Sequence, residues 1–522
     1  MKKLTLAMTA VAAFGGSALA ADLPAYTKAP PMVQSPPSWT GFYVFGGGGG
    51  GLWNADGNIV ANPGGLVTAG GTIPGGAAVT RDVRTGGSGW FGTVGAGYDW
   101  QFNGPWVAGV FADGQFGSIS GSILDFLTLS EGTETLRDSW AAGLRFGYLV
   151  APNVYSYVNG GYTGSQWSGA TLSGIVAGTL FVTSTPSFNR DGWFVGGGVE
   201  NSLNIFGISA PGWFMKTEYR AAYFGRIALP ETVIAGPGLG PTGFSETFKP
   251  WVQTISTSLV YRFNSTGPAA DGPARIYTKA PAAMAPMMSW TGLYVFGGAG
   301  GGLWEADGNV VNTGSGVALS RDVRTGGHGW FGTVGAGYDW QFNGPWVAGV
   351  FADGQFGSLS GSMIDSALLE GSETLRNSWA AGVRLGYLVA PNVYSYINGG
   401  YTGSHWSGAV FQTVVAPGLG GAPFVLSTPS FNRDGWFVGG GVENSLNIFG
   451  ISAPGWFMKT EYRAAFFDRI ALPETAIVAS PQNGVALGPT GFSDTFKPVV
   501  QTVSTSLVYR FNWTGAPVAA KY

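Results

Sequence analysis

The stretch VQTISTSLVYRF, residues 252–263, recurs as VQTVSTSLVYRF at residues 500–511. In both, apolar residues alternate with largely polar ones. Because successive side chains of a strand point to opposite faces, the stretch predicts a strand with one apolar and one polar face. Its 12 residues exceed the roughly 9 to 11 that a tilted strand needs to cross a bilayer. The pattern therefore indicates a membrane-spanning strand.

The apolar face of this strand ends in two aromatic residues, Tyr261 and Phe263, which correspond to Tyr509 and Phe511. Aromatic residues gather at the two membrane interfaces of transmembrane barrels. The pair resembles the C-terminal closing signal of bacterial outer-membrane barrels, with Ser258 in place of the usual Gly. The resemblance implies that each copy of the stretch is a barrel-closing strand, although the chain continues to residue 522.

The N-terminus has the pattern of a secretory signal. Two lysines at positions 2 and 3 precede an apolar run over residues 4–14, and Ala18-Leu19-Ala20 follows. A positive start, a short apolar core and an A-x-A site predict cleavage between Ala20 and Ala21. No other run approaches 18 apolar residues, so we expect no transmembrane helix.

The composition favours a lipid-facing barrel over a soluble core. Charged residues make up 11% of the chain, against about 25% in ordinary soluble domains. Gly accounts for 89 of 522 residues and aromatics for 14%. After loss of the two signal lysines, 24 Lys and Arg face 29 Asp and Glu, a net charge of −5 that does not suggest a nucleic-acid partner. Cys is absent, which excludes disulfides and a lipid-anchored N-terminal Cys.

The chain repeats itself. YTKAP at residue 26 returns at residue 277, and WFMKTEYRAA at residue 213 returns at residue 456. We call residues 39–263 the first copy and residues 290–511 the second copy. The predicted organisation is a signal peptide (1–20), a Pro-rich leader (21–38), the first copy, an Ala- and Pro-rich periplasmic linker (264–289), the second copy and a C-terminal tail (512–522).

Matching residues of the two copies are 251 positions apart at Trp39 and Trp290 but 240 apart at Arg81 and Arg321. Such insertions and deletions concentrate in loops. They define four variable segments of the first copy, near residues 54–87, 118–133, 168–187 and 227–247. The alternating stretches between them predict eight strands, over about residues 39–52, 88–102, 106–117, 134–150, 153–167, 188–206, 212–225 and 250–263.

Long and short connections alternate between these predicted strands. The short ones are Asn103-Gly104-Pro105, Ala151-Pro152-Asn153 and residues 207–211, and they keep their length in both copies. Outer-membrane barrels have this pattern, with tight periplasmic turns and longer external loops. Both ends of each copy are therefore expected on the periplasmic side.

Several stretches resemble the small outer-membrane barrel family of alpha-proteobacteria, which is related to OmpA-type transmembrane domains and includes outer-membrane immunogenic or porin-family proteins. The resemblance is carried by ADLPAYTKAPP, WTGFYVFGGGGGG, GWFVGGGVE, WFMKTEYR and LVYRFN, which begin at residues 21, 39, 192, 213 and 259. It covers each copy nearly end to end. It implies a bacterial outer-membrane location, lipid contact, and periplasmic chaperones and barrel-assembly machinery as partners during biogenesis. The doubling departs from the family.

Two copies of eight strands could form two eight-stranded barrels or one sixteen-stranded barrel. A sixteen-stranded closure needs a tight turn between the copies, whereas the junction 264–289 is long and repeats YTKAP. The first copy also keeps its closing stretch through Phe263. We therefore expect an all-β fold of two transmembrane antiparallel up-and-down barrels with eight strands each, with one sixteen-stranded barrel as the alternative.

Eight strands enclose an interior that side chains can fill, whereas sixteen leave an aqueous channel. Strand alternation places four acids and four bases in each predicted lumen. This balance favours a network of ion pairs that holds the barrel closed over a polar pore lining. The residues are Asp99, Asp113, Arg145, Glu200, Lys216, Glu218, Arg220 and Arg262 in the first copy, and Asp339, Asp353, Arg384, Glu443, Lys459, Glu461, Arg463 and Arg510 in the second.

Other motifs do not indicate catalysis. The glycine run 46–51 lacks the Lys-Ser or Lys-Thr of a phosphate loop, so we expect close strand packing there. The two histidines, His328 and His405, are both in the second copy, which excludes a His-dependent enzyme in both copies. No group of residues has metal-ligand spacing. We therefore expect no catalytic residue, metal site or cofactor.

The sequence favours an envelope-structural or surface-antigen role without catalysis. The alternatives are a sixteen-stranded porin for passive diffusion of small solutes and an adhesin that binds surface ligands through its loops. ALPET, at residues 228–232 and 471–475, and RDVRTGG, at residues 81–87 and 321–327, persist inside or beside the variable segments. The sequence does not explain this persistence, and it does not define the oligomeric state.

Overall fold

The computed structural model describes residues 38–68, 71–125, 127, 130–176, 179–205, 208–263, 289–365, 369–415, 425–448, 451–478 and 487–511. The predicted signal segment, with its cleavage between Ala20 and Ala21, lies outside the described residues, as do residues 21–37 of the leader, 264–288 of the linker and the tail 512–522. Among the described residues, no helix has the length and apolar character to cross a membrane.

The described part of the chain contains 26 strands. Those of the first copy are β1 (Gly41–Gly57), β2 (Ile59–Ala61), β3 (Leu66–Thr68), β4 (Gly71–Ile73), β5 (Val83–Phe102), β6 (Trp106–Asp125), β7 (Ser130–Ala151), β8 (Val154–Trp167), β9 (Thr171–Val176), β10 (Thr179–Ser184), β11 (Phe188–Ile205), β12 (Ile208–Phe224), β13 (Ile227–Ala235) and β14 (Gly240–Arg262). Those of the second are β15 (Gly292–Gly308), β16 (Val310–Asn312), β17 (Val323–Phe342), β18 (Trp346–Asp365), β19 (Leu369–Ala390), β20 (Val393–Trp406), β21 (Val410–Thr413), β22 (Val425–Ser427), β23 (Phe431–Ile448), β24 (Ile451–Phe467), β25 (Ile470–Val478) and β26 (Gly488–Arg510).

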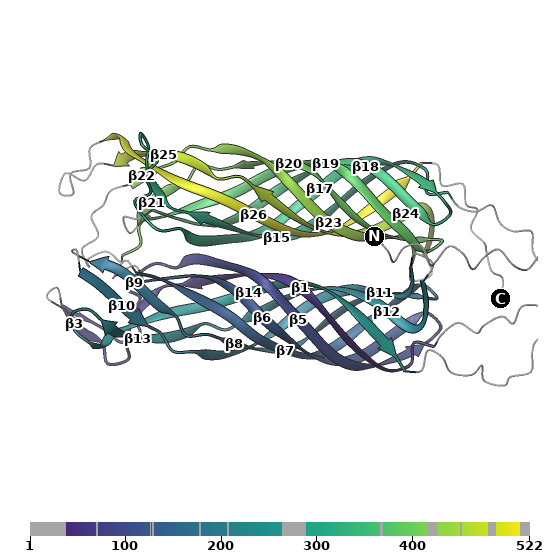
Figure 1. Cartoon of the computed structure of the whole chain (residues 1–522), viewed down its shortest axis with the longest axis horizontal. Coiled ribbons are helices and arrows are strands. Elements are labelled where there is room, and N and C mark those ends of the chain that lie inside the picture. Colours follow the sequence, from purple (N-terminus) through teal and green to yellow (C-terminus); the bar gives the residue numbers. More distant parts are fainter. Residues whose placement is uncertain are drawn as a thin grey trace, which may run out of the picture.

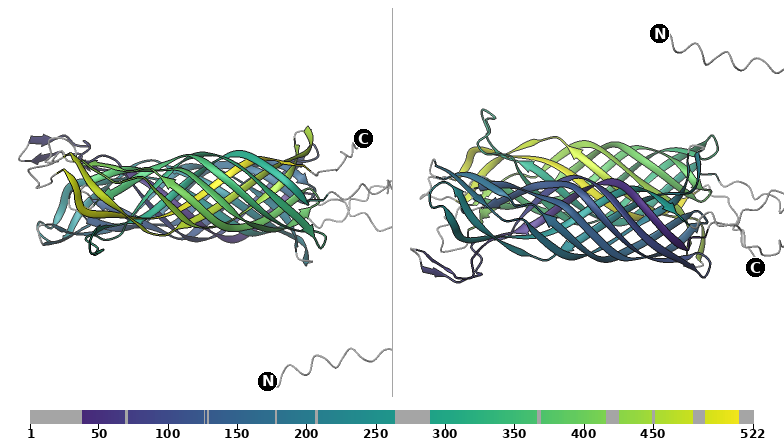
Figure 2. Two further views of the ribbon diagram at one scale, coloured as in Figure 1. Left: turned by 90° about the horizontal axis from the view of Figure 1, so that it is seen from above. Right: turned by 60° about the horizontal axis from the view of Figure 1, so that its bottom comes forward.

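The long strands of each copy form a closed ring of antiparallel pairs. In the first copy β1 pairs with β5 on one edge and with β14 on the other, and the pairs β5–β6, β6–β7, β7–β8, β8–β11, β11–β12 and β12–β14 complete the ring. In the second copy β15 pairs in the same way with β17 and β26. The two rings lie side by side, with strands inclined to the long axis (Figures 1 and 2).

The expectation of two separate eight-stranded barrels is wrong in two respects, the number of strands and the separation of the two copies. In the described part of the chain, 24 strands belong to one hydrogen-bonded sheet, and β3 and β4 form a second, small sheet. Thr85 of β5 pairs with Thr325 of β17, which joins the two copies. The sixteen-stranded alternative is also wrong, because β14 returns to β1 and leaves no strand edge for β15.

The extra strands arise where the variable segments were expected to be loops. In β13, which falls in the segment 227–247, Leu229, Glu231 and Val233 are buried while Ala228 and Pro230 are exposed. This alternation continues the strand pattern beyond the membrane-spanning region. Backbone pairing between strands therefore extends into segments whose length varies between the two copies.

The short connections include a glycine turn. Asn103 and Gly104 both have positive φ, 44° and 76°, and Asn343 and Gly344 repeat this with 45° and 75°. An Asn-Gly pair is favoured where both central residues need positive φ, because its twist matches that of the flanking strands. These residues join β5 to β6 and β17 to β18 at what we call the turn end of the rings. The opposite end, which has β13 and β25, is the loop end (Figure 1).

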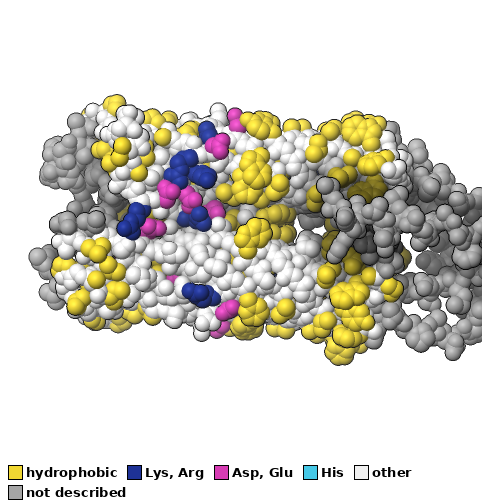
Figure 3. Space-filling view, viewed as in Figure 1, with side chains coloured by type: hydrophobic (Ala, Val, Ile, Leu, Met, Phe, Trp, Pro, Cys, Tyr) yellow, Lys and Arg dark blue, Asp and Glu magenta, His cyan; other side chains and the backbone are white. Residues whose placement is uncertain are grey.

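The outer surface of the rings has an apolar face with aromatic ends. On β5, the side chains of Trp90 and Trp100 are 80% and 48% exposed, and Leu144 on β7 is 66% exposed. Ten residues of a tilted strand advance about 25 Å along the axis, which is the height of the apolar band of a transmembrane barrel. In Figure 3, apolar side chains gather about midway along the rings and again towards the turn end. The exposed belts therefore match the two interfaces of a membrane.

Reciprocal hydrogen bonds join the two copies along a contact that we call the seam. Arg84 Nη1 donates to Ser360 O over 3.1 Å, and Arg324 Nη1 donates to Ser88 Oγ over 3.1 Å. Each arginine also pairs within its own copy, with Asp56 or Asp307, over 2.7 Å. Basic and acidic side chains lie together along the seam in Figure 3. The repeated RDVRTGG therefore supplies matching halves of a nearly two-fold contact.

Apolar groups and a second reciprocal pair complete the seam. Near the loop end, Val83 and Leu124 of the first copy cluster with Val414 of the second. Near the turn end, Asn153 Nδ2 donates to Val389 O and Asn392 Nδ2 donates to Val150 O, both over 3.0 Å. The copies therefore contact each other at both ends of the rings.

We expect a disulfide to form between Cys residues introduced as Thr85→Cys and Thr325→Cys, because paired antiparallel residues have Cα atoms about 4.5 to 5.5 Å apart, within disulfide range. The chain has no native Cys to interfere. Nonreducing electrophoresis of the denatured protein should show a faster band that reductant removes. The matched variant Thr93→Cys/Thr333→Cys, eight residues along the same strands and buried within each copy, should show no such band. Equal cross-linking of both pairs would contradict the seam.

Candidate functional site

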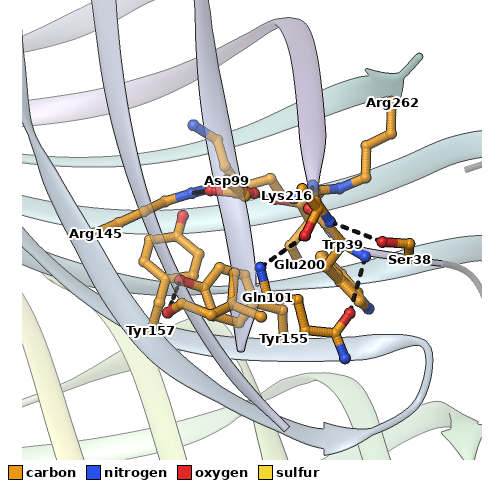
Figure 4. Close-up of polar contacts among 12 residues, drawn as sticks. Ser38, Trp39, Asp99, Gln101, Arg145, Tyr155, Tyr157, Glu200, Lys216 and Arg262 are labelled. Atoms are coloured by element: carbon orange, nitrogen blue, oxygen red, sulfur yellow. Dashed lines mark hydrogen bonds and ion pairs between the residues drawn. The ribbon is translucent and has the colours of Figure 1, made fainter. Parts of the chain in front are cut away.

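The first group of charges in the lumen lies near the turn end, and we call it the turn-end cluster: Asp99 of β5, Arg145 of β7, Glu200 of β11 and Arg262 of β14 (Figure 4). Arg145 donates from Nε to Asp99 over 2.9 Å and from Nη1 to Glu200 over 3.1 Å. Arg262 donates to the same two acids over 2.8 Å and 2.7 Å. Both guanidinium groups therefore bridge both carboxylates, and four strands are joined across the lumen.

Aromatic rings cover this cluster. The Arg145 guanidinium lies 4.1 Å from the centroid of the Tyr43 ring, and that of Arg262 lies 4.2 Å from the Trp39 ring. Trp39 also donates from Nε1 to Pro152 O over 3.0 Å. A Cβ at Gly97 would collide with the Tyr43 ring, so this strand position needs Gly to admit the aromatic side chain. Cation–π contacts stabilise desolvated arginines.

The second group, which we call the mid-lumen cluster, comprises Asp113 of β6 and Lys216, Glu218 and Arg220 of β12. Arg220 forms a two-pronged pair with Asp113, over 2.9 Å and 2.6 Å, and also contacts Glu218 over 2.8 Å. Lys216 Nζ lies 3.5 Å from Glu218, which also accepts from Tyr157 Oη over 2.7 Å. Each cluster therefore contains two acids and two bases.

The second copy repeats both clusters. Its turn-end cluster is Asp339, Arg384, Glu443 and Arg510, and its mid-lumen cluster is Asp353, Lys459, Glu461 and Arg463. The Arg463 contacts with Asp353 have the lengths seen in the first copy, 2.9 Å and 2.6 Å. The structure thus brings all sixteen residues that the sequence placed in a lumen into four neutral clusters. Sequence reasoning did not assign Trp39, Tyr43 or Tyr157 to them.

The lumen charges are almost completely shielded from solvent. Asp99 and Glu200 are 0% exposed, and Arg145 is 3% exposed. Removing a charge from water costs several kcal/mol, which an ion pair offsets only when its geometry is good and its other hydrogen bonds are made. Here each turn-end carboxylate meets two arginines. The charge clusters can therefore fill the lumen and hold its strands together.

The remaining sequence motifs have structural positions. The glycine run lies in β1, where a Cβ at Gly47 would meet the backbone of Thr257 and Ser258. His328 packs edge-on against Trp251 at the seam, with centroids 4.3 Å apart, and His405 Nδ1 lies 2.7 Å from Asn432 Oδ1. The closing aromatic residues pack on the outer face. The ring centroid of Tyr261 lies 5.2 Å from those of Trp213 and Phe263, and the ring centroid of Tyr509 lies 5.1 Å from that of Phe511.

Closed rings of strands with an exposed apolar face, aromatic belts and a charged interior define a transmembrane β-barrel protein. The chain is similar to the 31 kDa outer-membrane immunogenic proteins of Brucella melitensis and Brucella suis. With each it is 29% identical over 214 residues, which is 40% of this chain and 84% of the relative. Together, the fold and these relatives support an outer-membrane β-barrel protein.

No model of a protein family matches the chain. Among solved structures it is similar to a Pseudomonas aeruginosa FadL homologue, with 10% identity, a TM-score of 0.25 and 90% of each chain covered. It is also similar to the attachment invasion locus protein Ail of Yersinia pestis, with 15% identity, a TM-score of 0.19, and 41% of this chain and 99% of that one covered.

We expect Arg145→Met to destabilise the folded protein by about 3 to 5 kcal/mol, because it leaves an uncompensated buried carboxylate. Adding Asp99→Asn restores neutrality and should recover much of that loss, since Arg262 and Glu200 remain paired. The urea midpoint of the heat-sensitive folded gel band measures both effects. Arg226→Met is the control: its pair with Asp82 is 35% and 49% exposed, so it should cost under about 1 kcal/mol. Equal midpoints for Arg145→Met and Arg226→Met would contradict a stabilising cluster.

Proposed function

We propose that the protein is a non-catalytic structural protein and surface antigen of the outer membrane, whose lumens are closed to solutes. It would contact lipid through its aromatic belts and be inserted with the help of periplasmic chaperones and the barrel-assembly machinery. The observation that carries the proposal is the pair of charge clusters across each lumen.

The clusters support closure because each one connects strands across the ring. The turn-end cluster joins β5, β7, β11 and β14, and the mid-lumen cluster joins β6 to β12. A diffusion channel needs water beside its charged lining, whereas the side chains of Asp99 and Glu200 have no exposure. Such fully desolvated pairs support a filled interior.

The loop end supports the surface role. Strands such as β13 and β14 extend beyond the aromatic belt, and the connection between these two strands presents Leu239, which is 72% exposed. The copies differ here in length and sequence. Surface segments that vary without disturbing the rings are suited to being antigens, and the Brucella relatives are described as immunogenic outer-membrane proteins.

We expect the purified full-length protein to give no persistent channels in planar bilayers, because both clusters obstruct each lumen. A general-diffusion porin, inserted under the same conditions, provides the positive control. Recovery of the heat-sensitive folded band from the same bilayers would show that the protein was inserted. Stable conductance steps that scale with its concentration would overturn the closed-lumen proposal.

Single Cys variants should report the orientation in intact cells. Leu239→Cys at the loop end should react with a membrane-impermeant maleimide, whereas Pro152→Cys, exposed at the turn end, should react only after the outer membrane is permeabilised. The chain has no Cys of its own, so background labelling is low. If only Pro152→Cys is labelled in intact cells, the turn end faces outward, which would contradict an antigen at the loop end.

A further inference from the structure

Three acids of the second copy meet near the loop end: Asp365 at the end of β18, Glu474 in β25 and Asp494 in β26. One carboxylate oxygen from each lies within 4.8 Å of those of the other two. All three side chains are buried, with Asp494 only 1% exposed. They are 20 to 129 positions apart in sequence, so only the fold brings them together, and spacing along the chain gave no sign of them.

The second observation is that buried oxygens in this group have no partner. Neither carboxylate oxygen of Asp494 has a hydrogen-bond partner, and Glu474 Oε1 has none. The other oxygen of Glu474 accepts from Thr490 Oγ1 over 3.2 Å. Buried polar atoms are nearly always hydrogen-bonded, and a buried unpaired carboxylate is especially costly. Unpartnered oxygens directed at one another therefore indicate a missing positive ligand.

The first copy has acids at the three corresponding positions, Asp125, Glu231 and Glu246, which are 2%, 2% and 4% exposed. Glu231 Oε1 and Glu246 Oε2 also lack partners. Glu231 and Glu474 are the glutamates of the two ALPET stretches, and Glu246 stands where the second copy has Asp494. Carboxylates thus occupy all three positions twice, although the surrounding segments differ in length.

The electrostatic surroundings differ from those of the lumen clusters. Burial, followed by the neighbouring Asp365, raises the pKa of Glu474 to about 7, and burial with Asp125 raises the pKa of Glu231 to about 8. For Asp494, burial, Asp365 and Glu474 all raise the pKa, and no base opposes them. Without a cation, this group must take up protons or bear the cost of adjacent buried charges.

We propose that the second copy binds one divalent cation of the Ca²⁺ type through Asp365, Glu474 and Asp494. Ca²⁺ prefers oxygen ligands at roughly 2.3 to 2.6 Å, so two of its ligands are at most about 5 Å apart. Three carboxylates can supply up to about six such oxygens. The absence of Cys and His from this group disfavours zinc and copper.

The proposed site lies at the loop end, where an ion from outside the membrane can reach it. β13, β25 and the ends of β6 and β18 lie at the loop end, beyond the exposed Trp90 and Trp330 of the aromatic belt. The ion would connect the three strands β18, β25 and β26. These are the extensions whose ladders continue above the membrane, so ion binding would stiffen the surface part of the protein.

Equilibrium dialysis of the refolded, lipopolysaccharide-free full chain with radioactive Ca²⁺ tests the proposal. The wild type should bind about one ion per chain. The triple variant Asp365→Asn/Glu474→Gln/Asp494→Asn should lose the bound Ca²⁺. Asp322→Asn/Asp468→Asn, which removes two exposed acids of the second copy, should bind as the wild type does.

The heat-sensitive gel band shows whether each variant is folded, and single Asp494→Asn replaces the triple variant if it is not. Ca²⁺ should also raise the temperature at which the wild-type band shifts, and leave that of the triple variant unchanged. Equal Ca²⁺ binding by the wild type and the triple variant overturns the proposal. A wild type that binds no Ca²⁺ overturns it as well.

Discussion

Ring closure by backbone hydrogen bonding is the constraint on which the rest of this structure depends. At membrane depth no water can satisfy a free strand edge, so every N–H and C=O group needs a partner within the protein. β1 provides it in the first copy by pairing with both β5 and β14. Once this ring is closed, β15 cannot join it as a further strand. The second copy therefore closes its own ring and contacts the first through side chains and the Thr85–Thr325 pair.

Closure then decides what the lumen can contain. A narrow closed ring of long strands leaves space only for side chains, and the polar side of each strand must face inward. Charges placed there lose their hydration, so they need oppositely charged partners. The two arginines and two acids of the turn-end cluster meet this condition with five charged hydrogen bonds between 2.5 and 3.1 Å. Glycines in these strands leave room for the large side chains of the lumen. A Cβ at Gly97, for example, would collide with the Tyr43 ring.

The sequence predicted the long strands and the sides of their residues because alternation and turn chemistry are local. Trp90 outside and Asp99 inside follow from a period of two. The strand extensions were missed because insertions and deletions in residues 54–87 and 227–247 were interpreted as loops, although Leu229, Glu231 and Val233 still alternate. The joining of the copies was missed because Arg84 and Ser360 are 276 positions apart, and no local pattern marks such a contact.

The two kinds of buried acid show what determines the state of a carboxylate in this fold. Glu218 in the lumen is as buried as Glu231 at the loop end, but it has Lys216, Arg220 and Tyr157 within reach. The charged groups that act on Glu231 and Glu246 are all acids. A buried acid beside bases is stable as an ion, whereas a buried acid beside acids needs a proton or a metal. The persistence of ALPET amid variable sequence therefore has a physical explanation in its glutamate, just as that of RDVRTGG has one in the seam arginines.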